Sequence, residues 1–221
     1  MTSGRPPRPG GGAVLLPLLP CLLLLAGCTR AVDGAPTARP VESLPASAEE
    51  LEPLLVAEVP SGLPRLPDGE LDPPAGAKDA EDVAGYADDP ARERQVLEDY
   101  GYRHGWERFW GQGAAPMTVV FVDQFRTRAG AGAYAEDLAH NEAERYDAEL
   151  DEDPSDLPGG CRLLTVEAPG PGSGLTGPAA LAWCGHGVFS VGVTAVAGSV
   201  EAAEDEVGAV LVAQLDRLPP A

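Results

Sequence analysis

The sequence predicts an α+β domain in which helices pack on an antiparallel sheet of about five strands. Three observations lead to this fold class. Strand-like segments occur in pairs joined by short connections, which favours antiparallel pairing. A helix-like segment follows each of two such pairs, which points to two strand–strand–helix units over residues 102–146 and 179–218. The chain of 221 residues is also long enough to bury one sizeable core.

The folded domain is expected to span residues 51–221. It follows a segment, 28–50, whose Pro-, Ala- and Ser-rich composition is typical of a disordered tether. Ser47 and Glu50 form a capping-box pattern, so a short helix is expected to begin there. Residues 63–89 are polar and rich in turn formers, and they indicate a loop in which a short strand could be hidden.

Three helices are predicted from their caps and apolar spacing. Asp89 is suited to cap the first, and Gly101 to end it. Thr127 can cap a long second helix. Ser199 can cap the last one, whose apolar stripe is interrupted only by Gln214.

Five strands are predicted from alternation and from β-branched and aromatic residues: 102–110, 117–125, 161–168, 180–187 and 188–197. Strict alternation in the first would place Tyr102, Trp106 and Trp110 on one face.

The first 27 residues have the parts of a secretory leader. Arg5 and Arg8 precede an apolar run that contains Pro17 and Pro20, and no acidic residue is present. The run is shorter than the roughly 20 residues that a membrane-spanning helix needs. A basic start, a short apolar core and small residues at the end are typical of a signal peptide.

The leader ends in Leu25-Ala26-Gly27-Cys28, which resembles the lipobox of bacterial lipoproteins. In that family the cysteine thiol receives a diacylglyceryl group, and the leader is cut off just before it. The resemblance implies that Cys28 carries acyl chains such as palmitate and holds residues 28–221 on the outer face of the cell membrane. Two acyl chains give stable anchoring. Plain secretion with a coincidental cysteine is the alternative.

The charge of the chain excludes several partners. It has 15 basic and 35 acidic residues, a formal net charge of −20. Nucleic-acid binding needs a basic footprint, and anionic lipid attracts basic segments. We therefore expect no nucleic-acid partner and attachment to the membrane through lipid alone.

Two cysteines remain after Cys21 is lost with the leader and Cys28 is lipidated. Cys161 and Cys184 form an even pair in an exported chain, which predicts one disulfide. Two unpaired buried thiols are the alternative.

No catalytic residue, metal site or cofactor site is predicted. His104, His140 and His186 lack ligand spacing. The acidic stretch 147–156 departs from the EF-hand pattern and is expected to be a solvated loop, although its role is open. The glycine pattern 172–177 precedes a strand rather than the helix of a dinucleotide fingerprint.

The most suggestive side chains are aromatic ones, which could line a groove for a sugar or peptide: Tyr102, Trp106, Trp110 and Trp183. Core packing is the other explanation for them.

The layout and the stretch LLVAEVPSGL, residues 54–63, are similar to exported lipoprotein domains of actinobacteria, including those described as Mog1/PsbP-like. A single lysine, Lys78, and abundant Ala, Gly and Pro also look like coding from a GC-rich genome. The resemblance implies a membrane-anchored domain with a binding or accessory role towards an unidentified surface ligand or protein. A secreted hydrolase whose site is not recognisable in the sequence is the alternative.

Overall fold

The structure is a computed structural model that describes residues 43–113 and 115–220, all within one compact unit, Val41–Ala221. The leader, Cys28 and most of the predicted tether lie outside the described residues. The elements follow in chain order: η1 Ala48–Glu50, η2 Glu52–Leu54, η3 Asp68–Glu70, β1 Gly76–Lys78, α1 Ala80–Ala84, α2 Pro90–Tyr100, β2 Tyr102–Gly111, β3 Met117–Phe125, α3 Arg128–Tyr146, β4 Leu150–Asp151, β5 Cys161–Val166, β6 Ala179–His186, β7 Phe189–Val196 and α4 Val200–Leu215.

The sheet confirms the predicted α+β class but has seven strands rather than about five, in the order β1-β2-β3-β7-β6-β5-β4. Every neighbouring pair is antiparallel. The additional strands lie at the two edges. Strand β1 is the short strand that the sequence allowed within residues 63–89, whereas β4 corrects the expectation that the acidic stretch 147–156 is entirely loop. They contain only three and two residues, too few for an alternating pattern, so only pairing with β2 and β5 defines them.

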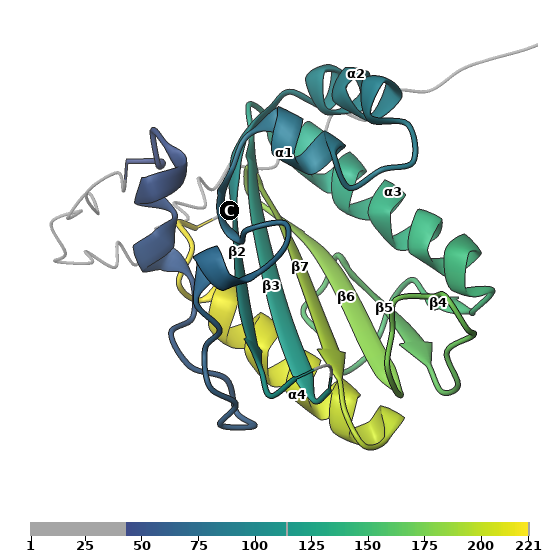
Figure 1. The fold of residues 1–221 in the computed structure, drawn as a ribbon. Helices are drawn as coiled ribbons and strands as arrows, with labels where there is room; N and C mark the ends of the chain where they lie inside the picture. The colour runs from purple at the N-terminus through teal and green to yellow at the C-terminus, as the bar shows by residue number, and fades with distance from the viewer. Residues whose placement is uncertain (1–42, 114, 221) are drawn as a thin grey trace, which may run out of the picture. The chain divides into compact units, whose positions relative to one another are not determined.

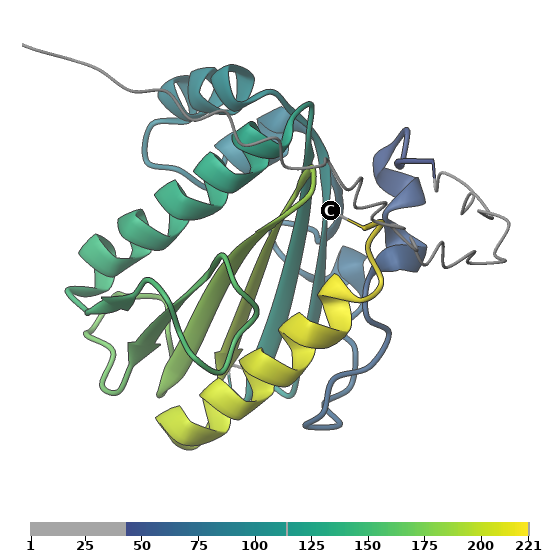
Figure 2. The same cartoon turned by 180° about the vertical axis from the view of Figure 1, so that it is seen from behind.

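The long helices α3 and α4 lie on opposite faces of the sheet (Figures 1 and 2). The predicted strand–strand–helix order is present, as β2-β3-α3 and β6-β7-α4. However, α3 does not cover mainly its own strand pair. Both helices pack chiefly on β6 and β7, so β2 and β3 are covered largely by other segments.

The caps predicted for the three longer helices are all present. In each one the side-chain oxygen accepts a hydrogen bond from the backbone N–H three residues later, at 3.1, 3.0 and 3.2 Å: Asp89, Thr127 and Ser199. Gly101 ends α2 with a φ of 79°, a conformation that glycine adopts readily. Ser47 precedes the short η1 but makes no side-chain cap.

On the α4 face, the buried core is completed by residues 51–59, which we call the strap. Leu51, Leu55, Val56 and Val59 of the strap are buried together with α4 and the sheet. Gln214, the polar interruption of the α4 stripe, is fully buried. Its amide accepts from the Val56 backbone N–H at 3.0 Å and donates to the Leu54 carbonyl at 3.0 Å.

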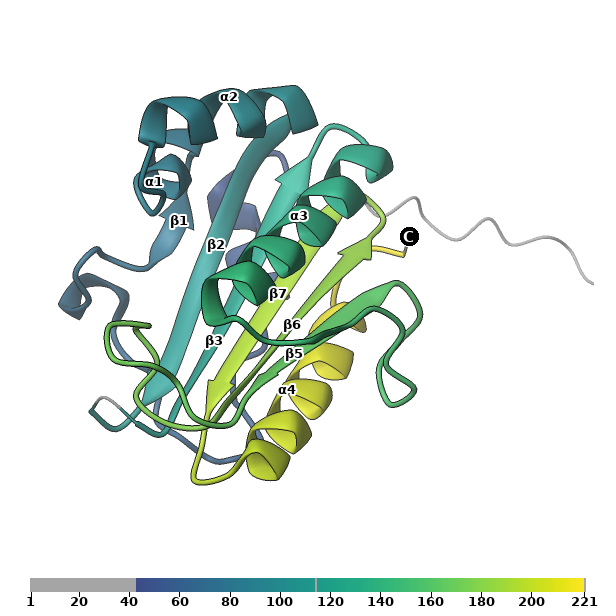
Figure 3. The same cartoon turned by 90° about the vertical axis from the view of Figure 1, so that its right-hand side faces the viewer.

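On the α3 face, two smaller apolar clusters form. The first lies between α3 and strands β5, β6 and β7, and includes Trp183. The second joins α1, α2, the start of α3 and the end of β3. Figure 3 looks onto this face, with α3 crossing β7 and β6 and with α1 and α2 at one end of β2.

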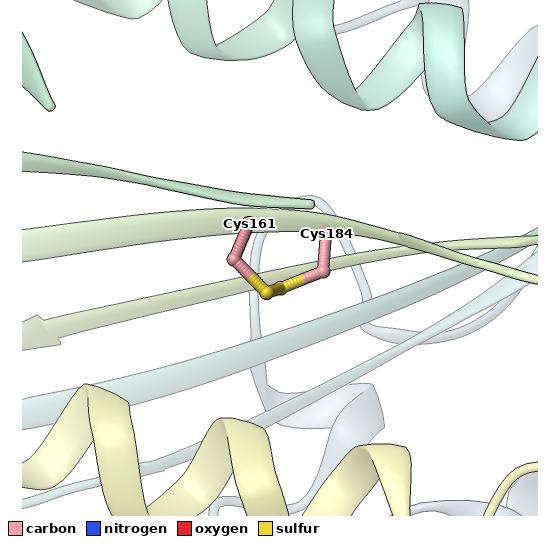
Figure 4. The surroundings of a disulfide bond; sticks show 2 residues. All are labelled: Cys161 and Cys184. Carbon is pink, nitrogen blue, oxygen red and sulfur yellow. A yellow bond between two sulfur atoms is a disulfide. The ribbon is translucent and has the colours of Figure 1, made fainter. Parts of the chain in front are cut away.

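The predicted disulfide is present in the structure. Cys161 on β5 and Cys184 on β6 are direct cross-strand partners with Cα atoms 4.2 Å apart. Figure 4 shows the bridge on the side of the sheet that faces α4, where both residues belong to the buried core. The bond closes the glycine- and proline-rich connection between the two strands.

We expect reduction of this disulfide to destabilise the domain. The bridged residues are 23 positions apart, and in the chain-entropy model such a loop constrains the unfolded state by roughly 3 kcal/mol. Chemical denaturation with and without a reductant should show a loss of this size. A Cys161→Ala/Cys184→Ala double variant that is insensitive to reductant is the control. An equal midpoint in both conditions would contradict the expectation.

Two glycines of α3 should respond oppositely to alanine. A Cβ on Gly130 would collide with the Tyr100 carbonyl oxygen, whereas a Cβ on Gly132 meets nothing within 4 Å. Gly132→Ala should therefore stabilise the domain by up to about 1 kcal/mol through helix propensity, and Gly130→Ala should destabilise it. Urea denaturation of both variants checks this pair, and the same sign of change in both would be inconsistent with the packing.

Candidate functional site

A groove of about 250 Å³ opens on the α3 face of the sheet, beside β2 and β3. Five of its lining side chains are apolar or aromatic, and two are carboxylates: Leu71, Pro73, Tyr86, Phe109, Phe121, Asp72 and Glu107. The groove therefore combines a mostly apolar surface with a few polar groups, as ligand-binding sites do.

The floor of the groove is formed by side chains of β2 and β3 that the pairing of these two strands places side by side. Glu107 is the direct cross-strand partner of Phe121, and Phe109 lies two residues further along the same face of β2. The rings of Phe109 and Phe121 meet edge to face, with centroids 6.2 Å apart. Both rings are only partly buried, so they present aromatic surface to a ligand.

The walls come from the segment that the sequence assigned to a loop. Residues 71–73 precede β1, and Tyr86 follows the short helix α1. Asp79 caps α1 by accepting hydrogen bonds from the backbone N–H groups of Glu81 and Asp82. This cap and the pairing of β1 with β2 fix where the wall stands relative to the floor.

Glu107 lies at the base of the groove and is almost fully buried, at 3% exposure. Its Oε2 is 3.5 Å from the Nζ of Lys78, which is 5% exposed. Within the described residues its Oε1 has no hydrogen-bond partner. Burial raises the pKa of Glu107, and this effect outweighs the hydrogen bond from the Tyr86 hydroxyl and the charge and hydrogen bond of Lys78, which act in the opposite direction.

Lys78, the single lysine of the chain, is held on three sides. Its Nζ donates a hydrogen bond to the Pro74 carbonyl, faces Glu107 and lies 5.8 Å from the centroid of the Tyr86 ring. The ammonium is therefore fully engaged by the wall and floor, and it acts as a fixed counter-charge for Glu107.

Asp123 lies beside Glu107 on the same face and is buried in the sheet. Its cross-strand partner is Gly105, and the space that a Cβ on Gly105 would need is filled by Asp123 Oδ1 and the Tyr102 hydroxyl. Burial, and secondarily the charge of Glu107, raise the pKa of Asp123 to about 7. A glycine is required here because two polar side chains meet in its place.

A second cleft, of about 290 Å³, lies on the α4 face beside the strap. The two arginines that line this cleft donate hydrogen bonds to backbone carbonyl groups, so their charges are not free to bind a ligand. Arg108 Nη1 donates to the Val56 carbonyl at 2.9 Å, and Arg217 Nη2 donates to the Pro53 carbonyl at 2.9 Å. These contacts hold the strap against the sheet, which assigns the cleft a structural role.

The aromatic residues singled out in the sequence do not come together. Trp106 and Trp110 are buried in the α4-face core, and Trp183 is buried against α3 on the other face. Tyr102 does not share the face of Trp106, contrary to the strict alternation. The register shifts between Tyr102 and His104, and this bulge turns Tyr102 towards Phe125 and Tyr134.

The three histidines also lie apart. His104 contacts the Gln124 side chain at 3.0 Å, His140 the Glu136 carbonyl at 2.9 Å, and His186 the Pro219 carbonyl at 3.1 Å. Over residues 43–113 and 115–220, no three His, Cys, Asp or Glu side chains gather in a way that could hold a metal ion.

Sequence reasoning did not find Tyr86, Glu107, Phe109 or Phe121. One signal was available in the predicted strand 102–110. Glu107 shares a strand face with Phe109, and an acidic residue is unusual in a strand that is otherwise rich in aromatic residues. The other signal was the isolated Lys78. The wall residues carried no signal because their position depends on a three-residue strand.

Comparisons with known proteins find no matching family model, no matching curated protein and no matching solved structure. The resemblance to lipobox lipoproteins and to Mog1/PsbP-like domains therefore stays a prediction. None of the helices in the described part of the chain is long and apolar enough to cross a membrane.

The buried Asp123 should make the stability of the domain fall as pH rises. Its pKa in the folded state is about 7, above its ordinary value of 3.8, so the folded state holds the proton more tightly. Stability is then lost as pH rises through this window, and the raised pKa of Glu107 acts in the same direction.

Replacing Asp123 by Asn should flatten this dependence. The thermal midpoint of Asp123→Asn is expected to fall less than that of the unaltered chain between about pH 5 and about pH 8. The exposed Asp88→Asn is a control for the change in charge. Equal slopes for Asp123→Asn and the unaltered chain would contradict the assignment.

Proposed function

We propose that this protein is a lipid-anchored extracytoplasmic lipoprotein whose folded domain binds a small ligand in the groove beside β2 and β3. The leader and Leu25-Ala26-Gly27-Cys28 support the location. The observation that carries the binding role is Glu107, a buried carboxylate whose Oε1 has no hydrogen-bond partner among the described residues and which lines an aromatic groove. A buried carboxylate oxygen left unpaired costs free energy, and a ligand group of complementary charge bound next to it would offset part of that cost.

The negative charge of the chain fits this arrangement. A net charge of −20 keeps the domain away from anionic lipid headgroups. The lipid on Cys28 would then hold the domain near the membrane while the groove stays accessible to ligands outside the cell.

Enzyme activity is the second candidate function. Glu107 and Asp123 are neighbouring acids with raised pKa values, and perturbed acids beside a groove are typical of acid–base catalysis. Against it, the groove lining contains no Ser, Cys or His side chain among the described residues. Hydrolysis of chromogenic ester, phosphoester and glycoside substrates that is abolished in Glu107→Gln would favour the enzyme.

Cys28 should carry lipid in the native host. Mass spectrometry of the mature N-terminus is expected to show cleavage before Cys28 and a diacylglyceryl-modified thiol. Cys28→Ala should release the protein from the membrane fraction, whereas the leader substitution Cys21→Ala, as a control, should not. An unmodified N-terminus after export, or a membrane-bound Cys28→Ala, would sink the anchoring proposal.

A further inference from the structure

The charged residues around the groove favour a ligand that carries a positive charge. Its lining contains Glu107 and Asp72 and no basic residue. Asp82 adds negative charge near Glu107 and Tyr86, and Asp123, whose pKa is about 7, adds a partial one. The cation that faces this group is Lys78, which is already engaged by the Pro74 carbonyl and Glu107. An anionic ligand would therefore be repelled, and a cation attracted.

The aromatic groups favour an organic cation over a metal ion. Phe109 and Phe121 form the floor, and Tyr86, which is 47% exposed, forms a wall. Aromatic faces attract alkylammonium groups through their quadrupole, more strongly where water is excluded. A divalent metal ion instead requires several oxygen ligands, and the described residues offer no such group.

Lys78 shows that this environment accommodates an ammonium. Its Nζ lies over the Tyr86 ring and beside Glu107 Oε2. Glu107 Oε1 is left without a hydrogen-bond partner within residues 43–113 and 115–220. A second ammonium entering from the groove would lie against the aromatic rings and next to the buried Glu107 carboxylate, whose Oε1 is itself closed to solvent.

We infer that the groove binds a small alkylammonium ligand, with its cationic head between Phe109, Phe121 and Tyr86 and with Glu107 as its counter-ion. This inference rests on the proposed binding function and specifies the chemical class of the ligand. The apolar residues Leu71 and Pro73 would cover the alkyl part at the rim.

Three probes of equal shape and different charge test the inference. Choline is the cation. Its uncharged analogue, with carbon in place of nitrogen, is 3,3-dimethylbutan-1-ol, and the anion is 3,3-dimethylbutanoate, which has the same tert-butyl head and a carboxylate in place of the alcohol. Each is titrated into the exported chain in nonionic detergent, and binding is followed by the backbone amide NMR shifts of Tyr86, Phe109 and Phe121. Choline should bind at least about tenfold more tightly than the uncharged analogue, a ratio equivalent to about 1.4 kcal/mol, and 3,3-dimethylbutanoate should not bind.

Variants test the assigned residues. Glu107→Gln should remove most of the preference for choline and change the affinity for the uncharged analogue by no more than about twofold. Glu98→Gln makes the same change at an exposed position of α2, outside the groove, and should alter neither affinity. Because Glu107→Gln leaves Lys78 without its carboxylate and could impair folding, Tyr86→Leu provides a second test at a half-exposed residue, and it should also weaken choline binding.

The outcomes separate the inference from the function on which it rests. Equal affinity for choline and its uncharged analogue, or an unchanged preference in Glu107→Gln, overturns the cation assignment but leaves a binding groove. Shifts that map away from Tyr86, Phe109 and Phe121 overturn the assignment of the site. The absence of shifts with all three probes overturns both the inference and the proposed binding role of the groove.

Discussion

Helices α3 and α4 both pack on β6 and β7, from opposite faces, and this placement governs the rest of the domain. Two helices over the same strands leave most of β2 and β3 to be covered by short helices and irregular chain. Irregular chain carries backbone groups that cannot pair with a neighbouring strand, so side chains must satisfy them. In the described part of the chain, all nine buried polar side chains accordingly lie on β1–β3, on the adjoining β7 or on α4.

The two faces of this half-sheet meet the requirement in different ways. On the α4 face the strap is fastened by Arg108, Gln214 and Arg217, whose side chains bond its carbonyl groups. On this face the strap completes the buried core, and the arginine contacts bridge the cleft beside it. On the α3 face, Lys78 bonds the Pro74 carbonyl and holds Glu107, but the loop before β1 leaves a groove. The candidate site is thus the place where the covering of the sheet is incomplete.

Two buried acids at the base of a groove cost folding free energy, and this cost is an argument for a functional role. Glu107 is paired with Lys78, Asp123 lies beside Glu107 in the same buried region, and the pKa values of both acids are raised. Apolar residues of similar size would remove the unpaired carboxylate oxygen and are often equally stable. Retaining two acids beside an aromatic groove is easier to understand if a ligand supplies a counter-charge, as the proposed alkylammonium would.

The sequence by itself determined the long elements and the disulfide. The segments of β2, β3, β5, β6 and β7 carry their own periodicity, and Asp89, Thr127 and Ser199 cap their helices through contacts only three residues away. The tertiary structure decided what depends on distant pairing. Strands β1 and β4 form only by pairing with their neighbours. A bulge in β2 turns Tyr102 to the other face of the sheet. Lys78, the ion-pair partner of Glu107, lies on the three-residue strand β1. Local patterns encode local hydrogen bonds, whereas the groove is formed by segments that meet only after the sheet is assembled.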